Sequence, residues 1–349
     1  MFWEKEGKLI YSYDGETVCI EAWGKDALRV RATKNRSFTG RDWALEAKDA
    51  HAGEVEIFED PSAKGGAFAN MYEGTDTSYG KITNGKLHAV IDSGSVITFY
   101  HEDGRVLLKE HFRRLRDEES MPLNIMGREY SNGVGDNFRI VARFVARKGE
   151  KIFGMGQYQQ HELDLKGCML ELAQRNSQVS VPFYLSSIGY GFLWNNPGVG
   201  QVMFANNGTE WVTESGKEID YLVIAGDTPA EIEENYMTLT GKPPMMPEYG
   251  MGFWQCKLRY WNQEQLLSVA RKYKELGVPL DVIVVDFFHW TKQGEFKFDP
   301  KYWPDVPGMC RELKEMGIQV VVSVWPTVDI YSENFEEMKE KGYLVRTEH

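Results

Sequence analysis

The chain has 349 residues, of which 42% are hydrophobic and 26% charged, as is typical of a soluble globular protein with a substantial core. Forty basic residues against 52 acidic ones give a net charge of −12, which argues against nucleic acid as a partner. No apolar run approaches the length of a membrane span, and the N-terminus lacks a signal-peptide pattern, so we expect a cytoplasmic protein that does not cross a membrane.

The first two thirds of the chain carry the pattern of an all-β domain. Short stretches of alternating polar and apolar residues, such as 17–23, 28–32 and 137–144, recur between turns rich in Gly, Asn and Asp. In the third stretch Phe138, Ile140, Ala142 and Phe144 share one face, as in a strand with one buried side. We therefore predict an N-terminal β-sandwich over residues 1–240.

A stiff connector follows this predicted domain. Thr228 and Pro229 begin a helix as its cap and first residue. Three prolines at positions 243, 244 and 247 then break the helical pattern. We place the domain boundary here, with a second domain over 241–349.

The second domain alternates between strands and helices. We expect strands at 249–257, 282–285 and 320–322, the last two being continuous apolar runs that suit parallel strands buried on both faces. Helices are predicted from Asn262 to Gly277, over 305–316 and over 332–341. This makes the first three β/α units of a (β/α)8 TIM barrel, incomplete because a whole barrel needs about 250 residues. The fold class is therefore multidomain, β followed by α/β.

An acid and several large aromatic residues follow the two apolar strands. Because barrel enzymes place their pocket at the carboxyl ends of the strands, we predict that Asp286, Phe287, Phe288, Trp290 and Trp325 bind substrate. Alternatively, Asp286 could cap the next turn, and the two Phe could pack in the core. Neighbours on a strand face opposite ways, so we expect one Phe to pack and the other to line the pocket.

Other candidates are weaker. Lys257, Arg259 and Tyr260 border this region from the first strand, but a solvated loop is the favoured interpretation. His289 has no partner at metal-ligand spacing and is predicted to be a packing residue. The four cysteines form no CxxC motif and are expected to be buried free thiols. Nucleotide-binding and nucleophile-elbow motifs are absent from the sequence, so no cofactor and no metal are expected.

Several stretches together resemble glycoside hydrolase family 31. They occur in the family's order, at residues 153–157 (FGMGQ), 178–191 (QVSVPFYLSSIGYG), 252–254 (GFW), 278–286 (VPLDVIVVD), 296–299 (FKFD) and 303–305 (WPD). The resemblance implies a galactose-mutarotase-like β-sandwich followed by a catalytic barrel. It also implies retaining, double-displacement hydrolysis of an α-glycoside by two aspartates, whose carboxyl groups lie about 5–5.5 Å apart in such enzymes.

In the family, both aspartates come from the fourth barrel strand onward, so we expect them beyond His349 and name no catalytic residue in this chain. The expected partners are a small oligosaccharide and the missing C-terminal half of the polypeptide; a homo-oligomer stays open. Asp286 matches the family aspartate that binds sugar hydroxyls. Phe287 and Phe288 stand where other members carry smaller or polar residues, and Trp325 where many α-glucosidases carry an aspartate.

These departures favour xylose, because bulky side chains leave less room for the CH2OH group of a hexose. The resemblance thus implies an α-xylosidase. An α-glucosidase or α-glucosyltransferase of the same family is the alternative, and a non-catalytic carbohydrate-binding fragment is the alternative from another class.

Overall fold

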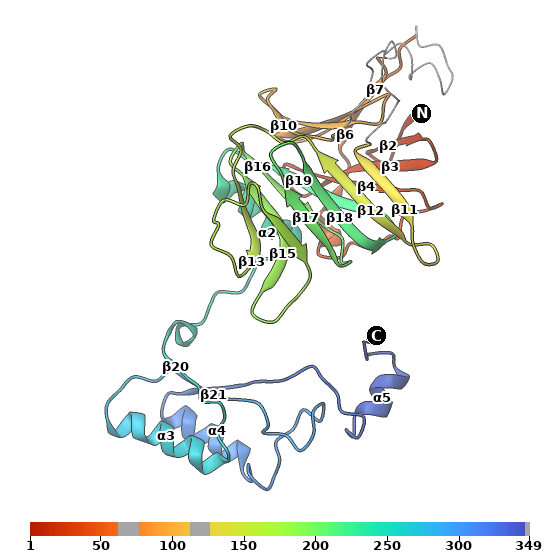
Figure 1. The fold of residues 1–349 in the computed structure, drawn as a ribbon. Helices are drawn as coiled ribbons and strands as arrows, with labels where there is room; N and C mark the ends of the chain where they lie inside the picture. The colour runs from red at the N-terminus through yellow and green to blue at the C-terminus, as the bar shows by residue number, and fades with distance from the viewer. Residues whose placement is uncertain (62–76, 112–125, 346–349) are drawn as a thin grey trace. The chain divides into compact units, whose positions relative to one another are not determined.

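Antiparallel strands recur through the described part of the first 225 residues, and the polypeptide then changes to alternating helices and parallel strands (Figure 1). The computed structural model describes residues 1–61, 77–111 and 126–345. The chain divides into two units, Met1–Pro243 and Pro244–His349.

The described residues of unit 1 form three antiparallel sheets. The largest has the order β1-β2-β3-β4-β19-β16-β15-β13, with β5 paired to β3. Its strands are β1 Phe2–Lys5, β2 Lys8–Tyr13, β3 Glu16–Trp23, β4 Ala27–Thr33, β5 Ala50–His51, β13 Ile152–Gln157, β15 Val179–Ser186, β16 Tyr190–Trp194 and β19 Ile219–Ala225. A 3-10 turn, η1, spans Ala47–Asp49.

The other two sheets have five strands each. The second has the order β10-β9-β8-β7-β6 and the third β11-β12-β18-β17-β14. Their strands are β6 Glu54–Phe58, β7 Tyr79–Asn84, β8 Leu87–Asp92, β9 Ile97–His101 and β10 Val106–Lys109, then β11 Arg128–Asn132, β12 Phe138–Phe144, β14 Met169–Leu172, β17 Gly200–Phe204 and β18 Thr209–Gly216. The predicted β-sandwich is confirmed.

One hydrophobic core joins the three sheets, and Val30, Phe99 and Trp211 enter it from one sheet each. Ile140 and Phe144 are no more than 1% exposed, so the face predicted for β12 is the buried one. Aromatic rings fill the centre, where offset rings gain more than their buried area alone contributes. The ring centroids of Phe192 and Trp211 are 5.1 Å apart.

Two buried arginines of unit 1 are paired with carboxylates. The guanidinium of Arg29 donates to both oxygens of Asp220, at 3.0 and 2.7 Å, and neither residue is exposed. The guanidinium of Arg128 lies between the carboxylates of Glu16 and Glu110. Pairing is what makes such charges tolerable in a medium of low dielectric constant.

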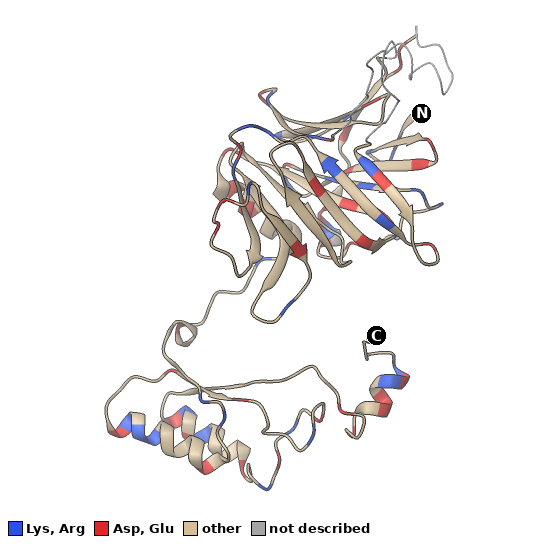
Figure 2. Cartoon of the chain, in the orientation of Figure 1, with Lys and Arg blue, Asp and Glu red and all other residues tan. Residues whose placement is uncertain are grey.

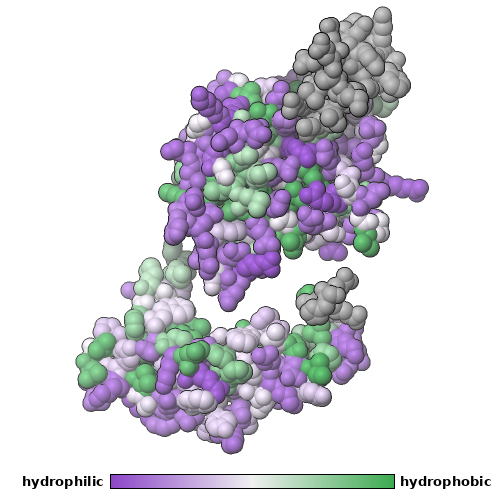
Figure 3. All heavy atoms as spheres, in the orientation of Figure 1, coloured by the Kyte–Doolittle hydropathy of each residue, from purple (hydrophilic) through white to green (hydrophobic). Residues whose placement is uncertain are grey.

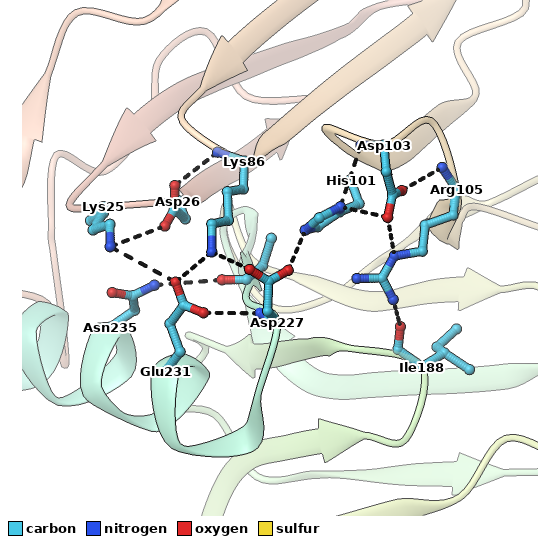
Figure 4. A network of polar contacts seen from close by, with 11 residues as sticks. Lys25, Asp26, Lys86, His101, Asp103, Arg105, Ile188, Asp227, Glu231 and Asn235 are labelled. Carbon is cyan, nitrogen blue, oxygen red and sulfur yellow. Dashed lines mark hydrogen bonds and ion pairs between the residues drawn. The ribbon is translucent and has the colours of Figure 1, made fainter.

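Helix α2, Pro229–Thr240, ends unit 1 and begins as predicted, with Thr228 Oγ1 accepting from the main-chain N–H of Glu231. A polar network holds its start against β8 and β9 (Figure 4). Lys86 Nζ lies 2.5 Å from Asp227 Oδ2 and 2.7 Å from Glu231 Oε1. His101 Nε2 lies 3.3 Å from the other oxygen of Asp227. The first turn of α2 is thus tied to the second sheet.

Unit 2 contains one parallel sheet, in the order β20-β21-β22. Its elements are the 3-10 turn η2 Glu248–Met251, β20 Trp254–Gln255, α3 Gln263–Glu275, β21 Val282–Val285, α4 Val306–Glu315, β22 Gln319–Val322 and α5 Phe335–Glu340. Helices α3 and α4 pack against the sheet through a core that includes Leu266, Ile283 and Leu313. The predicted barrel start is confirmed.

Three details of unit 2 differ from the sequence prediction. The first strand is only two residues long, because 248–251 turn into η2 instead of extending. Helix α5 begins at Phe335 because Ser332 Oγ accepts from Asn334 N in a preceding turn. Strand β22 is half-buried, whereas β21 carries the continuous buried run expected of both.

Surface charges of both signs are interspersed, as Figure 2 shows on α3 and α4 and across β11 and β12. On the face drawn in Figure 3, hydrophobic side chains of unit 2 alternate with hydrophilic ones. Among the described residues, no helix is long and apolar enough to cross a membrane.

Candidate functional site

Asp286 follows β21 directly, at the carboxyl end of the central strand of unit 2. Its Oδ1 accepts from the main-chain N–H of Phe287 at 2.8 Å, so it does cap the turn. Its Oδ2 lies 3.8 Å from Cys256 Sγ, which follows β20. One carboxylate oxygen is therefore held by main chain, and the other is near only a weak thiol donor.

Phe287 and Phe288 lie together, and the expectation that they face opposite ways is wrong. Their ring centroids are 4.4 Å apart. Both residues come after the last residue of β21, where the alternation of a strand no longer applies. Phe288 also has a φ of +63°, a left-handed conformation that bulky residues rarely adopt. This turn brings the second ring back beside the first.

Trp325 and Trp290 complete an aromatic cluster with the two Phe. The rings of Phe287 and Trp325 are stacked, with centroids 5.2 Å apart and planes 15° apart. Trp325 lies 6.3 Å from Phe288 and 6.2 Å from Trp290. The structure thus brings all five predicted substrate-binding residues to one end of the sheet.

A cavity of about 260 Å³ lies beside this cluster. Trp290 and Trp325 line it together with Phe296, Phe298 and Val324, whereas Asp286, Phe287 and Phe288 do not. It is smaller than the about 300–1,000 Å³ of sites for drug-sized ligands, and suits a compact group such as one sugar ring. Its apolar walls offer ring faces to the C–H side of a pyranose.

His289 is only 4% exposed and packs on Phe298, with ring centroids 4.7 Å apart. Its Nδ1 lies 3.1 Å from the main-chain oxygen of Asp286. Burial lowers the pKa of His289, so the ring is neutral at pH 7. This agrees with the predicted packing role. Among the described residues, no group of His, Cys, Asp and Glu could hold a metal ion.

Arg259 is not the solvated loop residue that was favoured. Its guanidinium carbon lies 3.8 Å from the ring centroid of Trp261 and 5.2 Å from that of Phe288. Such stacking is favourable because the ring face is electron-rich. Tyr260 is 4% exposed and belongs to the core of unit 2, whereas Lys257 is exposed as expected.

Cys256 is the functional candidate that sequence analysis missed, because the cysteines were expected to be buried. Only Cys19 is buried, and Cys256 and Cys310 are exposed. Burial, together with the negative charge of Asp286, raises the pKa of Cys256. The thiol stays protonated at neutral pH and adds no second charge near the carboxylate. Its position near the carboxyl end of the first predicted strand, 249–257, was the available signal.

Comparison with protein families gives two matches. The model "Glycosyl hydrolase 31 N-terminal galactose mutarotase-like domain" matches residues 17–202, and the model "Glycosyl hydrolases family 31 TIM-barrel domain" matches residues 243–349. The first alone covers more than half of the chain.

Three similar proteins add detail. An "Uncharacterized family 31 glucosidase ORF2" of Pseudescherichia vulneris is 42% identical over 99% of this chain and 64% of its own length. An "Alpha-xylosidase" of Saccharolobus solfataricus is 36% identical over 60% of this chain and 30% of its own. The crystal structure of a GH31 alpha-xylosidase from a soil metagenome, complexed with xylose, has a TM-score of 0.88 at 44% identity, covering all of this chain and 50% of the other. The chain thus spans well under the full length of the relatives it matches.

Proposed function

We propose, from the premise that this chain belongs to glycoside hydrolase family 31, that it forms the N-terminal part of an α-xylosidase acting on small oligosaccharides. The observation that carries this proposal is the aromatic cluster beside Asp286. Phe287, Phe288 and Trp325 converge on one another from two different strand ends. Together they would form a narrow apolar wall next to a carboxylate.

The carboxylate would hold the sugar by its hydroxyl groups. Among the residues that the structure describes, the polar contact of Asp286 Oδ2 is the Cys256 thiol, at 3.8 Å, so its lone pairs are available to O–H donors. A charged acceptor makes stronger hydrogen bonds than a neutral one, which would favour a fixed orientation of the ring.

The aromatic wall would select the size of the sugar. Xylose and glucose differ by the CH2OH group on C5, and a pocket lined by rigid rings rejects that group by steric overlap. The stacked pair Phe287 and Trp325 has little freedom to move aside, because each ring supports the other. The similarity to an alpha-xylosidase crystallised with xylose supports the same choice.

The chemical step would be a double displacement by two aspartates supplied by the remaining length of the polypeptide. One carboxylate attacks the anomeric carbon, while the other protonates the leaving oxygen and then activates water. Within this chain, Asp286 and the aromatic cluster would bind and orient the sugar and exclude water from one side.

An α-glucosidase is the second candidate, because a relative at 42% identity is described as a family 31 glucosidase. The two candidates differ in one measurable ratio. The complete polypeptide should hydrolyse 4-nitrophenyl α-xyloside with a higher kcat/KM than 4-nitrophenyl α-glucoside. A ratio in favour of glucoside would refute the xylosidase proposal and support the glucosidase. No turnover of either would favour the non-catalytic carbohydrate-binding alternative.

The role of Asp286 is tested by Asp286→Ala in the complete polypeptide. We expect kcat/KM to fall by about 30- to 1,000-fold, which corresponds to about 2–4 kcal/mol of lost charge-assisted contacts. Asp329→Asn is the matched control, because its Oδ1 also caps a turn, accepting from Tyr331 N at 2.8 Å. The control should keep kcat/KM within about twofold of the wild type. If Asp286→Ala also stays within that range, Asp286 only caps its turn.

A further inference from the structure

Trp43 of unit 1 is held in an unfavourable conformation without being buried. Its φ is +54°, in the left-handed region, yet 47% of its surface is exposed. A bulky residue rarely occupies this region unless the surrounding structure imposes it. Packing explains little of the conformation, since almost half of the residue faces solvent and the guanidinium carbon of Arg41 lies 5.6 Å from the ring centroid. Strain of this kind at an exposed aromatic residue points to a binding function.

Buried side chains fix the backbone on both sides of Trp43. Arg29 Nη1 donates to Asp42 Oδ1 at 2.8 Å, and Arg29 itself is 0% exposed. Asn195, which is 4% exposed, donates from Nδ2 to the main-chain oxygen of Asp42 at 3.1 Å and accepts at Oδ1 from Ala44 N at 3.3 Å. The indole is therefore presented by a rigid segment, which lowers the entropy cost of binding a ligand.

Two depressions in unit 1 meet at Trp43. One has a volume of about 690 Å³ and the other about 550 Å³. Both are lined by Trp43, Asn196, Pro197 and Gly198, so the two depressions adjoin at these residues, and together they are called the groove. Each is larger than the cavity beside the aromatic cluster of unit 2.

The groove has a polar half and an apolar half. In the polar half, Asn137 Nδ2 donates to Ser215 Oγ at 3.1 Å, so the amide oxygen of Asn137 and the hydroxyl proton of Ser215 remain to bond a ligand. Two of the charges there are already engaged, since Lys217 Nζ lies 2.7 Å from Asp136 Oδ2. In the other half, apolar residues that include Leu172, Val181 and Pro182 form the wall.

We propose that this groove is a second carbohydrate site, which binds a neutral oligosaccharide across Trp43. A pyranose ring is apolar on its C–H faces and polar at its edge, so it matches an indole flanked by amides and hydroxyls. The two adjoining depressions, of about 690 and 550 Å³, have room for more than one sugar, so we expect several linked sugars to bind. The choice of a xylose-branched glucan as the ligand rests on the proposed function. The site itself does not, because it lies within unit 1.

The test is equilibrium binding by the 349-residue chain, measured by isothermal titration calorimetry. The probe is a β-glucan tetramer carrying α-xylosyl branches, with free xylose in parallel. We expect saturable binding of the oligosaccharide and none of xylose at the same concentration. Absence of binding at millimolar oligosaccharide would overturn the proposal. So would binding of only an acidic oligosaccharide such as a galacturonate tetramer. Neither result depends on hydrolysis, so the proposed function is judged separately.

Trp43→Asn is the decisive variant, since asparagine removes the ring and tolerates a left-handed conformation. We expect affinity to fall by about tenfold or more with Tm unchanged or raised. Trp3→Ala is the matched control, because Trp3 is 37% exposed on the same unit, and should bind as wild type. Equal affinity of Trp43→Asn, or equal loss in both variants, would refute the site. In the complete polypeptide, a loss of binding together with protection of Trp43 from oxidation would mean that the rest of the protein covers the groove, which also overturns the proposal.

Discussion

Replacement of Arg29 by methionine should destabilise unit 1 by about 3–5 kcal/mol, the usual cost of removing one partner of a buried ion pair. Arg29 donates to both oxygens of Asp220, to Asp42 Oδ1 and to the main-chain oxygen of Arg41, at 2.7–3.0 Å. After the substitution, Asp220 keeps only Asn195 Nδ2, at 2.9 Å, as a side-chain donor. Methionine fills a similar volume, so the cost comes mainly from the unpaired carboxylate.

The loss is measurable as a drop in Tm of about 6–20 °C for a unit of this size, followed by near-ultraviolet circular dichroism of the aromatic core. Arg139→Met is the control, because Arg139 and Glu214 form an exposed pair at 3.2 Å that contributes less than about 1 kcal/mol. The double variant Arg29→Met with Asp220→Leu should recover most of the loss, since no buried charge is left unpaired. A loss in Arg29→Met no larger than in the control would refute this reasoning.

The pH dependence gives a second check on the same residue. Burial raises the pKa of Asp220 to about 6 although Arg29 lowers it, and without Arg29 it should rise further. The folded variant then binds a proton more tightly than the unfolded chain, whose Asp titrates near about 3.9. Stability of the variant must therefore fall as pH rises from about 4 through the folded pKa. Its deficit relative to wild type should be largest at neutral pH.

Three further outcomes are expected. Burial raises the pKa of Cys19 from 9.0 to about 11, so the unfolded chain loses its thiol proton first and unit 1 should lose up to about 3 kcal/mol of stability between pH 9 and 11; Cys19→Ala should abolish that slope in alkaline unfolding curves. Phe288→Ala should raise the kcat/KM for α-glucoside relative to α-xyloside by about tenfold or more in the complete polypeptide, because the Phe288 ring is more exposed than that of Trp325. An unchanged ratio would exclude Phe288 from the pocket. Lys86→Met should speed amide exchange in the first turn of α2, where Lys86 bridges Asp227 and Glu231, and unchanged exchange would show that the cap at Thr228 suffices.

Local signals predicted much of unit 2. Helix α3 is capped by Asn262, whose side chain accepts from Gln265 N, and helix α4 by Asp305, which accepts from Gly308 N. Such contacts lie within one turn, so they can be inferred from spacing alone. A capping box at the start of α3 would also have the Gln265 side chain accept from Asn262 N. Instead, Gln265 Oε1 accepts from Trp261 N.

Contacts between distant segments could not be predicted in this way. The position of Asp286 was deduced from the end of its strand, but its neighbour Cys256 comes from another strand 30 residues earlier. The groove at Trp43 has walls from loops that end near Asn137, Asn196 and Ser215. The left-handed turn at Phe288 has no sequence signal either, because aromatic residues seldom adopt it.

The order of strands in the largest sheet affects how the protein can be synthesised. Strand β4 pairs with β19, and Arg29 lies 191 residues before Asp220. At about 5–20 residues per second, a ribosome needs about 10–40 s to make the intervening segment. During that interval β4 has an unpaired edge, and Arg29 lacks the carboxylate that it will bury. A nascent chain that stalls before β19 should therefore aggregate or occupy chaperones, whereas one released after it can complete the sheet.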